Sequence, residues 1–402
     1  MITADFFGKS LCYIFGQNNF EGEMSESAKK IKVLYVVENT SYGGGERGFG
    51  QLASAINRNR FLPFIAAHAG GILEENAKET GAKYFPLNMR SKLNLKTISK
   101  ISRIIAKHDI NIVHSMGPRA DFFARIACKK MHNVKVISTI AMLIEGYDVN
   151  PFKKSIYKLA DCYSSKYVAH FITVSKALKT KLIQDRKIPE NKISVIYNGV
   201  ELNKFNPDCY SSNGLRDSMG IEKDCLIVGS IGRLVYQKGF KYLIEAAKVL
   251  HNKSNKIKFV IVGDGPEGEN LRKMVEVFDI SKSFTFTGVR FDIPQILAMY
   301  DIFVLPSVLE GLPRVIIEAM AMAKPIVATD INGVREQLVH DCTGLIVPAK
   351  NPAALAKAII QLINDKYKAN RLGIEARKSA RLKFDLKQTV RNIEKLYENI
   401  LV

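Results

Sequence analysis

The chain has 402 residues, of which 47% are apolar and 24% charged, and this composition is typical of a globular rather than a disordered protein. No apolar run of about eighteen residues or more occurs, which argues against a membrane-spanning helix. The formal net charge of +20 favours an anionic partner: nucleic acid, an anionic membrane surface or an acidic substrate.

Residues 1–30 contain one short apolar stretch, Leu11 to Phe15, without a basic leader, a long apolar core or a small-residue cleavage site. We therefore expect a poorly ordered extension rather than a signal peptide. Six cysteines have no paired spacing, and no CxxC occurs; they are Cys12, Cys128, Cys162, Cys209, Cys225 and Cys342. Free thiols in a reducing cytoplasm are the expectation, without disulfides, a zinc site or another metal.

From Ile31 onward, short β-rich apolar runs alternate with amphipathic helical stretches. In the first half the expected strands include Ile31–Val37, Phe61–Ala67, Ile112–Ser115, Val136–Ile140, Phe171–Ser175 and Ile193–Tyr197. In the second half they include Leu226–Ile231, Phe259–Gly263, Phe284–Gly288, Ile302–Pro306, Ile326–Thr329 and Leu345–Val347. This alternation predicts an α/β protein with parallel sheets that helices cover on both faces.

The strands are too many for one ordinary sheet, and the Asn-, Pro-, Ser- and Gly-rich segment Asn203–Gly220 is a natural break. We expect two Rossmann-like, doubly wound domains at residues 31–205 and 206–385, and a terminal helix at 386–402 that crosses back to the first domain. Ligands bind at the carboxyl ends of parallel strands, so the cleft between the domains is the expected site.

Two features of the first half could reach this cleft. Three glycines follow the first strand in Ser41–Arg47, and Gly44 and Gly45 would let a ligand approach the backbone at a helix start. No GxxxxGK[ST] occurs, so this is not a nucleotide triphosphatase loop. His114 ends a strand and could be catalytic, although a lone histidine is more often structural.

The first half also holds most of the basic excess: residues 31–205 contain 28 Lys and Arg against 13 Asp and Glu. Within Phe152–Lys187, nine basic residues are interleaved with aromatic and aliphatic ones. A basic helix with an apolar face is typical of peripheral attachment to an anionic membrane. The alternative is a core-packed helix with a solvated basic face.

In the second half, a glycine-ended strand leads into Arg233 and Lys238, two cations that could hold a diphosphate. The alternative is two solvated surface cations. The following Gly263-Asp-Gly265-Pro-Glu-Gly268 matches GxGxxG. However, Pro266 and Glu267 occupy the pyrophosphate position and no acidic residue ends the next strand, so we interpret it as a tight turn at the cleft edge.

The segment Ile302–Met320 is the most informative. A strand ends at Pro306 and a helix is expected to start at about Pro313, where a missing amide costs nothing. Gly311 permits close backbone approach, and the free amides at the helix start can bind an anion. Glu310 precedes the helix, and Glu318 lies within it among apolar neighbours, where a carboxylate can accept hydrogen bonds from both ribose hydroxyls. Complementing the helix dipole explains Glu310 tolerably but Glu318 poorly.

These motifs together resemble glycosyltransferase family 4, which has the GT-B fold, over residues 31–402. The resemblance rests on Glu310-x7-Glu318 within Ser307-x-x-Glu-Gly-x-Pro, on Gly232-Arg233 with Lys238-Gly239, on Gly263-Asp-Gly-Pro266, on Gly288 and Pro325–Thr329, on Gly43-Gly-Gly-Glu46 and on Asn198-Gly-Val200. Met116, Ala141 and Ala323 depart from the pattern, where the family often has histidine, histidine and glycine.

The resemblance implies a metal-independent, retaining hexosyltransferase with a nucleotide-diphosphate sugar as co-substrate. Arg233 and Lys238 would hold the diphosphate, Glu318 the ribose, and Glu310 with Gly311, Leu312 and Pro313 the sugar and distal phosphate. Val289 and Arg290 would lie near the base, and Gly265 at the cleft edge. The acceptor would be a glycan or a lipid-linked sugar in cell-surface polysaccharide, lipopolysaccharide or glycolipid synthesis. We expect a cytoplasmic protein, with peripheral contact at the inner face of the cell membrane as the form that membrane attachment would take.

Three other classes remain open. Another two-domain nucleotide-sugar enzyme, such as an epimerase, would need an evident acid and base, which the sequence does not offer. A hinged ligand-binding protein would usually carry an export signal. A nucleic-acid binder would be expected to show a recognised basic and aromatic motif.

Overall fold

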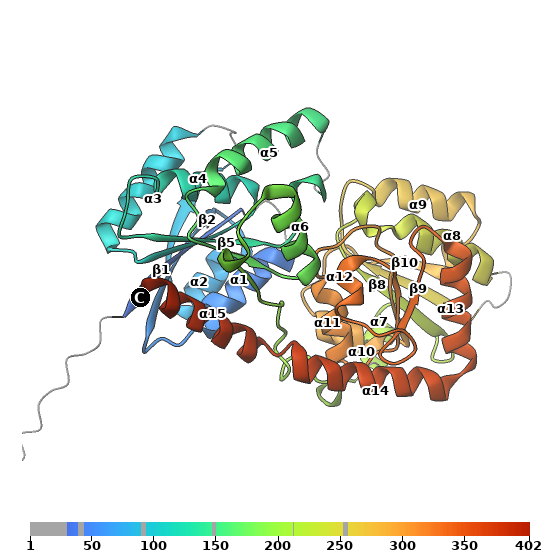
Figure 1. Ribbon diagram of the computed structural model, residues 1–402. Helices are drawn as coiled ribbons and strands as arrows, with labels where there is room; N and C mark the ends of the chain where they lie inside the picture. The colour runs from blue at the N-terminus through green and yellow to red at the C-terminus, as the bar shows by residue number, and fades with distance from the viewer. Residues whose placement is uncertain (1–29, 39–43, 90–93, 147–149, 212, 252–255) are drawn as a thin grey trace, which may run out of the picture.

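The computed structural model describes residues 30–38, 44–89, 94–146, 150–211, 213–251 and 256–402, which form two α/β domains side by side (Figure 1). Each domain is built on one parallel sheet, so the predicted pair of facing Rossmann-like domains is confirmed. The extension predicted for residues 1–30 lies outside the described residues except for Lys30.

The first sheet has the strand order β3-β2-β1-β4-β5-β6-β7. Its strands are β1 (Ile31–Val37), β2 (Phe61–His68), β3 (Lys83–Leu87), β4 (Ile112–Met116), β5 (Lys135–Ile140), β6 (His170–Thr173) and β7 (Ile193–Val195). The helices are α1 (Gly44–Ala55), α2 (Ile72–Thr80), α3 (Leu95–His108), α4 (Pro118–Ala127), α5 (Pro151–Ser165) and α6 (Lys176–Arg186). Val33–Val37 are all buried, as expected for a central strand that is covered on both faces.

The second sheet has the order β10-β9-β8-β11-β12-β13. Its strands are β8 (Leu226–Ile231), β9 (Ile257–Val262), β10 (Phe284–Phe286), β11 (Ile302–Leu305), β12 (Ile326–Thr329) and β13 (Leu345–Val347). The helices are α7 (Asn213–Ser218), α8 (Phe240–His251), α9 (Gly268–Val277), α10 (Ile293–Met299), α11 (Arg314–Ala321), α12 (Asn332–Arg335), α13 (Pro352–Asn364) and α14 (Lys366–Lys383). The loops after β8 and β11 are neighbours because these two strands pair.

The strand β3 was not among those expected from the sequence. It lies at the edge of the first sheet, only its last residue is buried, and it contains Pro86. An edge strand tolerates a proline and needs little apolar surface, so the pattern that identifies buried strands is weak here.

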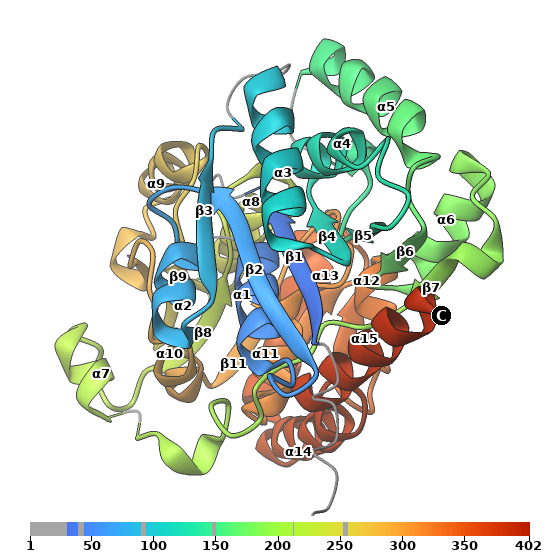
Figure 2. The same cartoon turned by 90° about the vertical axis from the view of Figure 1, so that its left-hand side faces the viewer.

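The chain passes between the domains twice, and the two crossings are hydrogen-bonded to each other. The Val200 amide donates to the Phe384 carbonyl (2.8 Å), and the Leu386 amide donates to the Val200 carbonyl (3.0 Å). Helix α15 (Leu386–Leu401) then packs against the first domain, beside α1 (Figures 1 and 2). Its Val390, Ile393 and Tyr397 join the core that lies against β1. None of the described helices is long and apolar enough to cross a bilayer.

Candidate active site

Two residues singled out in the sequence meet where the loops after β8 and β11 adjoin. The Lys238 Nζ lies 2.5 Å from the Glu310 Oε1, and the Ser307 hydroxyl donates to the same oxygen (2.8 Å). Glu310 is almost buried and Lys238 is mostly so. The two loops therefore hold a cation and a carboxylate in contact, in a largely desolvated pair.

Arg233 has a different environment, because its side chain is exposed and no hydrogen bond or ion pair of its guanidinium occurs within the described part of the chain. Its loop is fixed by the turn after β9. The Leu234 amide donates to the Asp264 carbonyl (2.9 Å), and the Glu267 amide donates to the Leu234 carbonyl (2.9 Å). Arg233 is thus a cation on a hydrogen-bonded loop, five residues before Lys238 in the sequence.

The GxGxxG segment supports this loop and does not open as a nucleotide cradle. A Cβ on Gly265 would lie 2.5 Å from the Leu234 carbonyl oxygen, and one on Gly263 would lie 1.9 Å from the Gly232 oxygen. Gly263 also has φ of +137°, which favours glycine. These glycines are required because two backbones touch, which agrees with the interpretation of a tight turn.

The Gly311 backbone lies against the first domain. A Cβ on Gly311 would be 1.8 Å from the Ala141 carbonyl oxygen, and the Asn198 side-chain amide donates to the Leu312 carbonyl (3.2 Å). Helix α11 begins at Arg314 with Pro313 at its N-cap position, one residue later than expected. The start of this helix therefore faces the interdomain boundary.

Glu318 is only 3% exposed, and its partner comes from the other domain. The Arg47 guanidinium, on α1, lies 3.3 Å from its Oε1. Arg314, one turn before Glu318, donates to Gln51 of α1, which in turn donates to Glu201 (2.6 Å). Burial lowers the pKa of Arg314 to about 10, and Glu318 opposes this shift. Sequence reasoning did not identify Arg47 or Arg314 as site residues, because the partners of these side chains lie in the other domain.

The two predicted glycines at the start of α1 also contact side chains. A Cβ on Gly44 would lie 3.4 Å from the Arg314 Cδ, and one on Gly45 would lie 2.8 Å from the Met116 Cε. In this structure the glycines make room for Arg314 and Met116, and a donor role for them stays a prediction. The preceding Ser41, Tyr42 and Gly43 lie outside the described residues.

Val289 and Arg290, expected near the base, follow β10. The Gly288 carbonyl just before them accepts a hydrogen bond from the Gly263 amide (2.8 Å), so the two loops adjoin. Val289 is exposed, and Arg290 makes two hydrogen bonds to Asp292 (2.8 and 2.5 Å), which lower the pKa of that carboxyl group. An exposed apolar side chain beside a fixed guanidinium is a suitable surface for a base.

His114 is fully buried. Its Nδ1 lies 2.5 Å from the Tyr397 hydroxyl and its Nε2 lies 2.7 Å from the Thr139 hydroxyl, so both nitrogens are engaged. Burial lowers the pKa of the imidazole to about 3. A group that stays neutral above that pH is a poor proton carrier near neutral pH. The geometry favours the structural role of His114 over the catalytic one.

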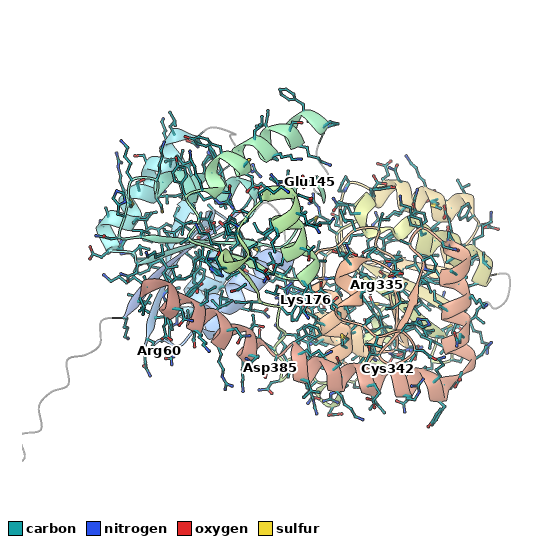
Figure 3. The ribbon with its side chains drawn as sticks, viewed as in Figure 1. Arg60, Glu145, Lys176, Arg335, Cys342 and Asp385 are labelled. Carbon is teal, nitrogen blue, oxygen red and sulfur yellow. The ribbon has the colours of Figure 1, made fainter. Side chains whose placement is uncertain are left out.

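The domains are closed on each other by contacts at several points. The Glu336 carboxylate accepts hydrogen bonds from the Lys176 and Ala177 amides (2.8 and 2.9 Å) at the start of α6, and Figure 3 places Lys176 at the boundary with the second domain. A carboxylate at a helix N-terminus is favourable. The Gln237 side chain also donates to the Gly146 carbonyl. Polar contacts therefore join the two domains across the cleft.

Comparison with known proteins gives matches for both halves of the chain. The profile of the family described as "Glycosyltransferase Family 4" matches residues 42–204, and that of "Glycosyl transferases group 1" matches residues 212–379. The two matched segments lie within the first and the second sheet domain respectively.

Among curated proteins, the chain is 26% identical to an Escherichia coli UDP-Gal:alpha-D-GlcNAc-diphosphoundecaprenol alpha-1,3-galactosyltransferase, over 94% of this chain and all of the relative. It is 28% identical to a Campylobacter jejuni N,N'-diacetylbacillosaminyl-diphospho-undecaprenol alpha-1,3-N-acetylgalactosaminyltransferase, over 78% of this chain and 84% of the relative.

Among solved structures, a glycosyltransferase from Rickettsia africae aligns with a TM-score of 0.79 and 25% identity, over 92% of this chain and 99% of the other. Anabaena HepE in complex with UDP-glucose aligns with a TM-score of 0.80 and 22% identity, over 92% of this chain and all of the other. At 22% identity, the similarity to HepE is a similarity of fold alone.

Proposed function

Because the chain belongs to glycosyltransferase family 4, we propose that it transfers a hexosyl unit from a nucleotide-diphosphate sugar, with retention of configuration, to a sugar acceptor carried on a lipid diphosphate. The observation that carries this proposal is the Lys238–Glu310 pair beside the exposed Arg233 at the cleft. The two cations would hold the donor diphosphate, and Glu310 would lie at the donor sugar.

The physical reason is the charge that develops during transfer. The departing nucleoside diphosphate gains negative charge as its bond to the sugar breaks, and preorganised cations stabilise that charge most effectively where water is excluded. Lys238 is mostly buried, so its charge acts through a less polar medium than water. Glu310 holds its ammonium in place until the donor arrives.

The acceptor class is supported by the printed activities of the relatives. The Escherichia coli and Campylobacter jejuni relatives both carry names that specify a sugar on diphospho-undecaprenol as the acceptor. A third relative, 26% identical over 77% of this chain, is a capsular polysaccharide biosynthesis glycosyltransferase from Staphylococcus aureus. A role in building cell-envelope polysaccharide follows for this chain.

The test is a panel of nucleotide-diphosphate sugars incubated with the purified chain, without acceptor. Slow release of free nucleoside diphosphate is the expected result, because water can replace the acceptor. An epimerase would instead return an intact nucleotide-sugar with a changed sugar. Failure to hydrolyse any donor of the panel, or epimerisation without hydrolysis, would refute the proposal.

Transfer is expected to survive excess chelator. Arg233 and Lys238 would supply the positive charge that a divalent metal supplies in many other enzymes that act on phosphate esters. The measurement is donor hydrolysis before and after dialysis against chelator, and then after Mg²⁺ or Mn²⁺ is added back. Complete loss that metal restores would show that the two cations are insufficient.

Helix α5 supports attachment to an anionic membrane. Only Ser164 of its fifteen residues is buried, while Phe152, Leu159 and Tyr163 are 73%, 72% and 50% exposed. The helix lies at the outer edge of the first domain (Figure 1). Its exposed lysines are Lys153 and Lys158, and the exposed Lys166 follows directly as the C-cap. The helix is therefore not core-packed, and an outward apolar stripe between lysines suits the headgroup region.

We therefore expect the chain to sediment with anionic vesicles but not with neutral ones, and to lose binding at high salt. Each cation near such a surface contributes about 1 kcal/mol, which salt screens. Replacing Lys153, Lys154, Lys158 and Lys166 with glutamine should abolish binding, and Phe152→Ser with Leu159→Ser should weaken it. Tyr367→Ser with Leu382→Ser is the matched control, because both side chains are 82% exposed on α14. If the control weakens binding equally, α5 is not the contact.

A further inference from the structure

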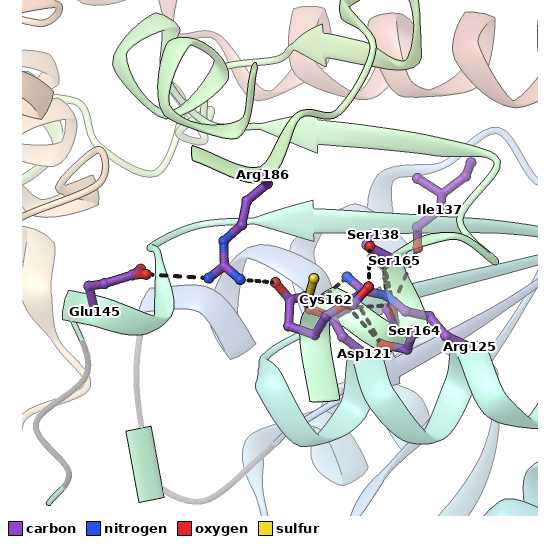
Figure 4. A network of polar contacts seen from close by, with 11 residues as sticks. Asp121, Arg125, Ile137, Ser138, Glu145, Cys162, Ser164, Ser165 and Arg186 are labelled. Carbon is purple, nitrogen blue, oxygen red and sulfur yellow. Dashed lines mark hydrogen bonds and ion pairs between the residues drawn. The ribbon is translucent and has the colours of Figure 1, made fainter. Parts of the chain in front are cut away.

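The inner side of helix α5 is tied to the first domain by a buried polar network (Figure 4). The Arg125 Nη1 lies 2.7 Å from the Asp161 Oδ1 and donates to the Ser164 hydroxyl (3.3 Å). The Arg186 Nη1 lies 3.4 Å from the other oxygen of the same carboxylate. Because the Arg125 side chain is fully buried, these contacts fix which face of α5 points outwards.

The outward face of α5 is an apolar stripe that ends in a lysine. Four exposed residues follow one another at intervals of seven, four and three residues, a spacing that places them on one face of a helix. They are Phe152, Leu159, Tyr163 and Lys166. From Phe152 to Tyr163 the stripe covers about 16 Å, at 1.5 Å per residue. The helix begins on the side of the second domain and ends away from it (Figure 1).

A second lysine reaches the far end of this stripe from the neighbouring helix. Lys129 follows α4, which packs against α5, and its Nζ donates to the Tyr163 hydroxyl (3.4 Å). The Lys129 Nζ also lies 5.6 Å from the centre of the Tyr167 ring. The Lys166 Nζ lies 4.6 Å from the centre of the Tyr163 ring and 5.3 Å from that of Tyr167. We call these four residues the Tyr–Lys cluster.

The Tyr–Lys cluster carries an excess of positive charge. Among the described residues, no carboxylate forms an ion pair with Lys129 or Lys166. Desolvation raises the pKa of the Tyr167 phenol, but a hydrogen bond with Tyr163 and the two lysines outweigh it, so the pKa lies below its usual value. Hydrogen bonds with Tyr167 and Tyr163 also raise the pKa of Lys129. The cluster therefore stabilises negative charge at this point of the surface.

A phosphate group fits this set of donors. Each ammonium carries three N–H donors and each phenol one O–H, and an ionised phosphate offers charged acceptor oxygens to them. The apolar stripe indicates which phosphate, because a free phosphate or a nucleic acid in water gains nothing from Phe152 and Leu159. A phospholipid presents its phosphate beside its acyl chains, and tyrosine suits this boundary between apolar and aqueous surroundings.

We propose that the Tyr–Lys cluster binds the phosphate of an anionic phospholipid headgroup. Lys129 and Lys166 neutralise its charge, and the Tyr163 and Tyr167 hydroxyls donate hydrogen bonds to it. The proposal rests on the proposed attachment of α5 to an anionic membrane, and it adds the site and the lipid group that this site recognises.

Such a site would fix the orientation of the first domain on the membrane. The stripe begins at Phe152, six residues after Gly146, whose carbonyl accepts a hydrogen bond from Gln237 of the second domain. The Tyr–Lys cluster lies at the other end of the same helix. A headgroup held at the cluster, together with apolar contact at Phe152, keeps α5 flat and the cleft end of the helix at the membrane plane, where a lipid-linked acceptor lies.

Sedimentation with vesicles tests the site. The probes are vesicles of phosphatidylcholine alone and of equal parts phosphatidylcholine and phosphatidylglycerol. Lys129→Gln with Lys166→Gln should weaken binding to the anionic vesicles by about thirtyfold or more, the loss expected for two cations at such a surface. The wild-type chain and all variants should ignore the neutral vesicles.

Lys130→Gln with Lys153→Gln is the matched control. It also removes one exposed lysine after α4 and one from α5, but in the described part of the chain neither lies over the two tyrosine rings. This pair should weaken binding by about fivefold at most. General attraction between charges predicts the same loss for both pairs, whereas a headgroup site predicts the difference.

Tyrosine variants separate a phosphate site from charge alone. Tyr163→Phe with Tyr167→Phe keeps both rings and the net charge and removes only the two hydroxyl groups. Binding to the anionic vesicles should fall by about fivefold to tenfold, because hydrogen bonds to a charged group are lost. Tyr157→Phe, on α5 but away from the stripe, should have no effect. Melting temperature and donor hydrolysis should stay at the wild-type level in all of these variants.

The outcomes separate this proposal from the one on which it rests. If the wild-type chain ignores anionic vesicles, the attachment of α5 fails and the headgroup site fails with it, while donor hydrolysis still decides glycosyltransfer. If the chain binds but the two lysine pairs lose affinity equally, or the double phenylalanine variant binds like wild type, attachment stands and the headgroup site does not exist.

Two further measurements decide the source of the phosphate. Calorimetric titration with inorganic phosphate should show no binding that Lys129→Gln with Lys166→Gln removes. Such binding would identify a soluble phosphate as the ligand and overturn the lipid assignment. Loss of binding to single-stranded RNA, with vesicle binding unchanged, would overturn it in favour of a nucleic acid.

Discussion

Replacement of Lys238 by alanine is expected to lower the turnover number by about a hundredfold or more, with a smaller change in the KM for the donor. Removal of one charge-stabilising donor from an active site typically has an effect of this size. The ammonium acts mainly on the charge that appears as the diphosphate departs, so the loss falls on the turnover number. Arg233→Ala should act in the same direction. The measurement is steady-state donor hydrolysis by each variant.

The variant also leaves Glu310, whose side chain is only 8% exposed, without its cation. A largely buried, unpaired carboxylate costs stability, so the melting temperature of Lys238→Ala should fall. Adding Glu310→Gln removes the unpaired charge and should restore the melting temperature without restoring turnover. Lys248→Ala is the control for loss of a lysine, because this exposed side chain on α8 lies over the Phe278 ring instead of the cleft. Recovery of turnover in the double variant would mean that Lys238 serves only to neutralise Glu310.

Replacement of Glu318 by glutamine is expected to weaken binding of the free nucleoside diphosphate by roughly tenfold to a hundredfold. A carboxylate offers two charged oxygens to the two ribose hydroxyls, whereas an amide offers one neutral acceptor, and hydrogen bonds to charged groups are the stronger ones. The side chain is 3% exposed, so it acts where water competes little. Calorimetric titration measures the change directly.

Glu318 also holds Arg47 of the first domain at 3.3 Å, so its loss could act through domain closure alone. Arg47→Gln separates these roles, because it breaks the interdomain pair and leaves the carboxylate intact. If Glu318 binds the ribose, Arg47→Gln should keep most of the nucleotide affinity. Equal losses in the two variants would assign Glu318 to closure and not to the ribose.

The Glu318 carboxylate already has a cationic partner, Arg47 of the first domain. In the closed arrangement the carboxylate is engaged with a guanidinium, and Arg314 lies beside it with a lowered pKa. A ribose that takes this carboxylate competes with Arg47. If Glu318 binds the ribose as predicted, nucleotide binding and the contact between α1 and α11 would be coupled through this one side chain.

Most of the fold could be predicted from the sequence, because buried parallel strands are marked by continuous apolar runs that turn residues bound. The runs at Ile31–Val37, Leu226–Ile231 and Ile326–Thr329 are strands with the expected ends. Edge strand β3 carries no such run, so it can be identified only from its pairing with β2 in the folded sheet. Strand β1, in the middle of the first sheet, could be predicted because both of its faces are buried.

The sequence by itself determined which loops carry the candidate donor residues, since Arg233, Lys238, Glu310 and Glu318 each follow a recognisable strand end or lie in the helix after it. Only the tertiary structure decided what each side chain meets. His114 lies in the middle of its strand instead of at the end expected, and Tyr397, 283 residues further along the chain, covers its ring. Arg47 reaches Glu318, and Arg314 fills the space beside Gly44, only because two domains close on each other. Periodicity reports which face of an element is buried, whereas the partner across a domain boundary depends on sheet order and on the crossing of α15, and no local pattern records either.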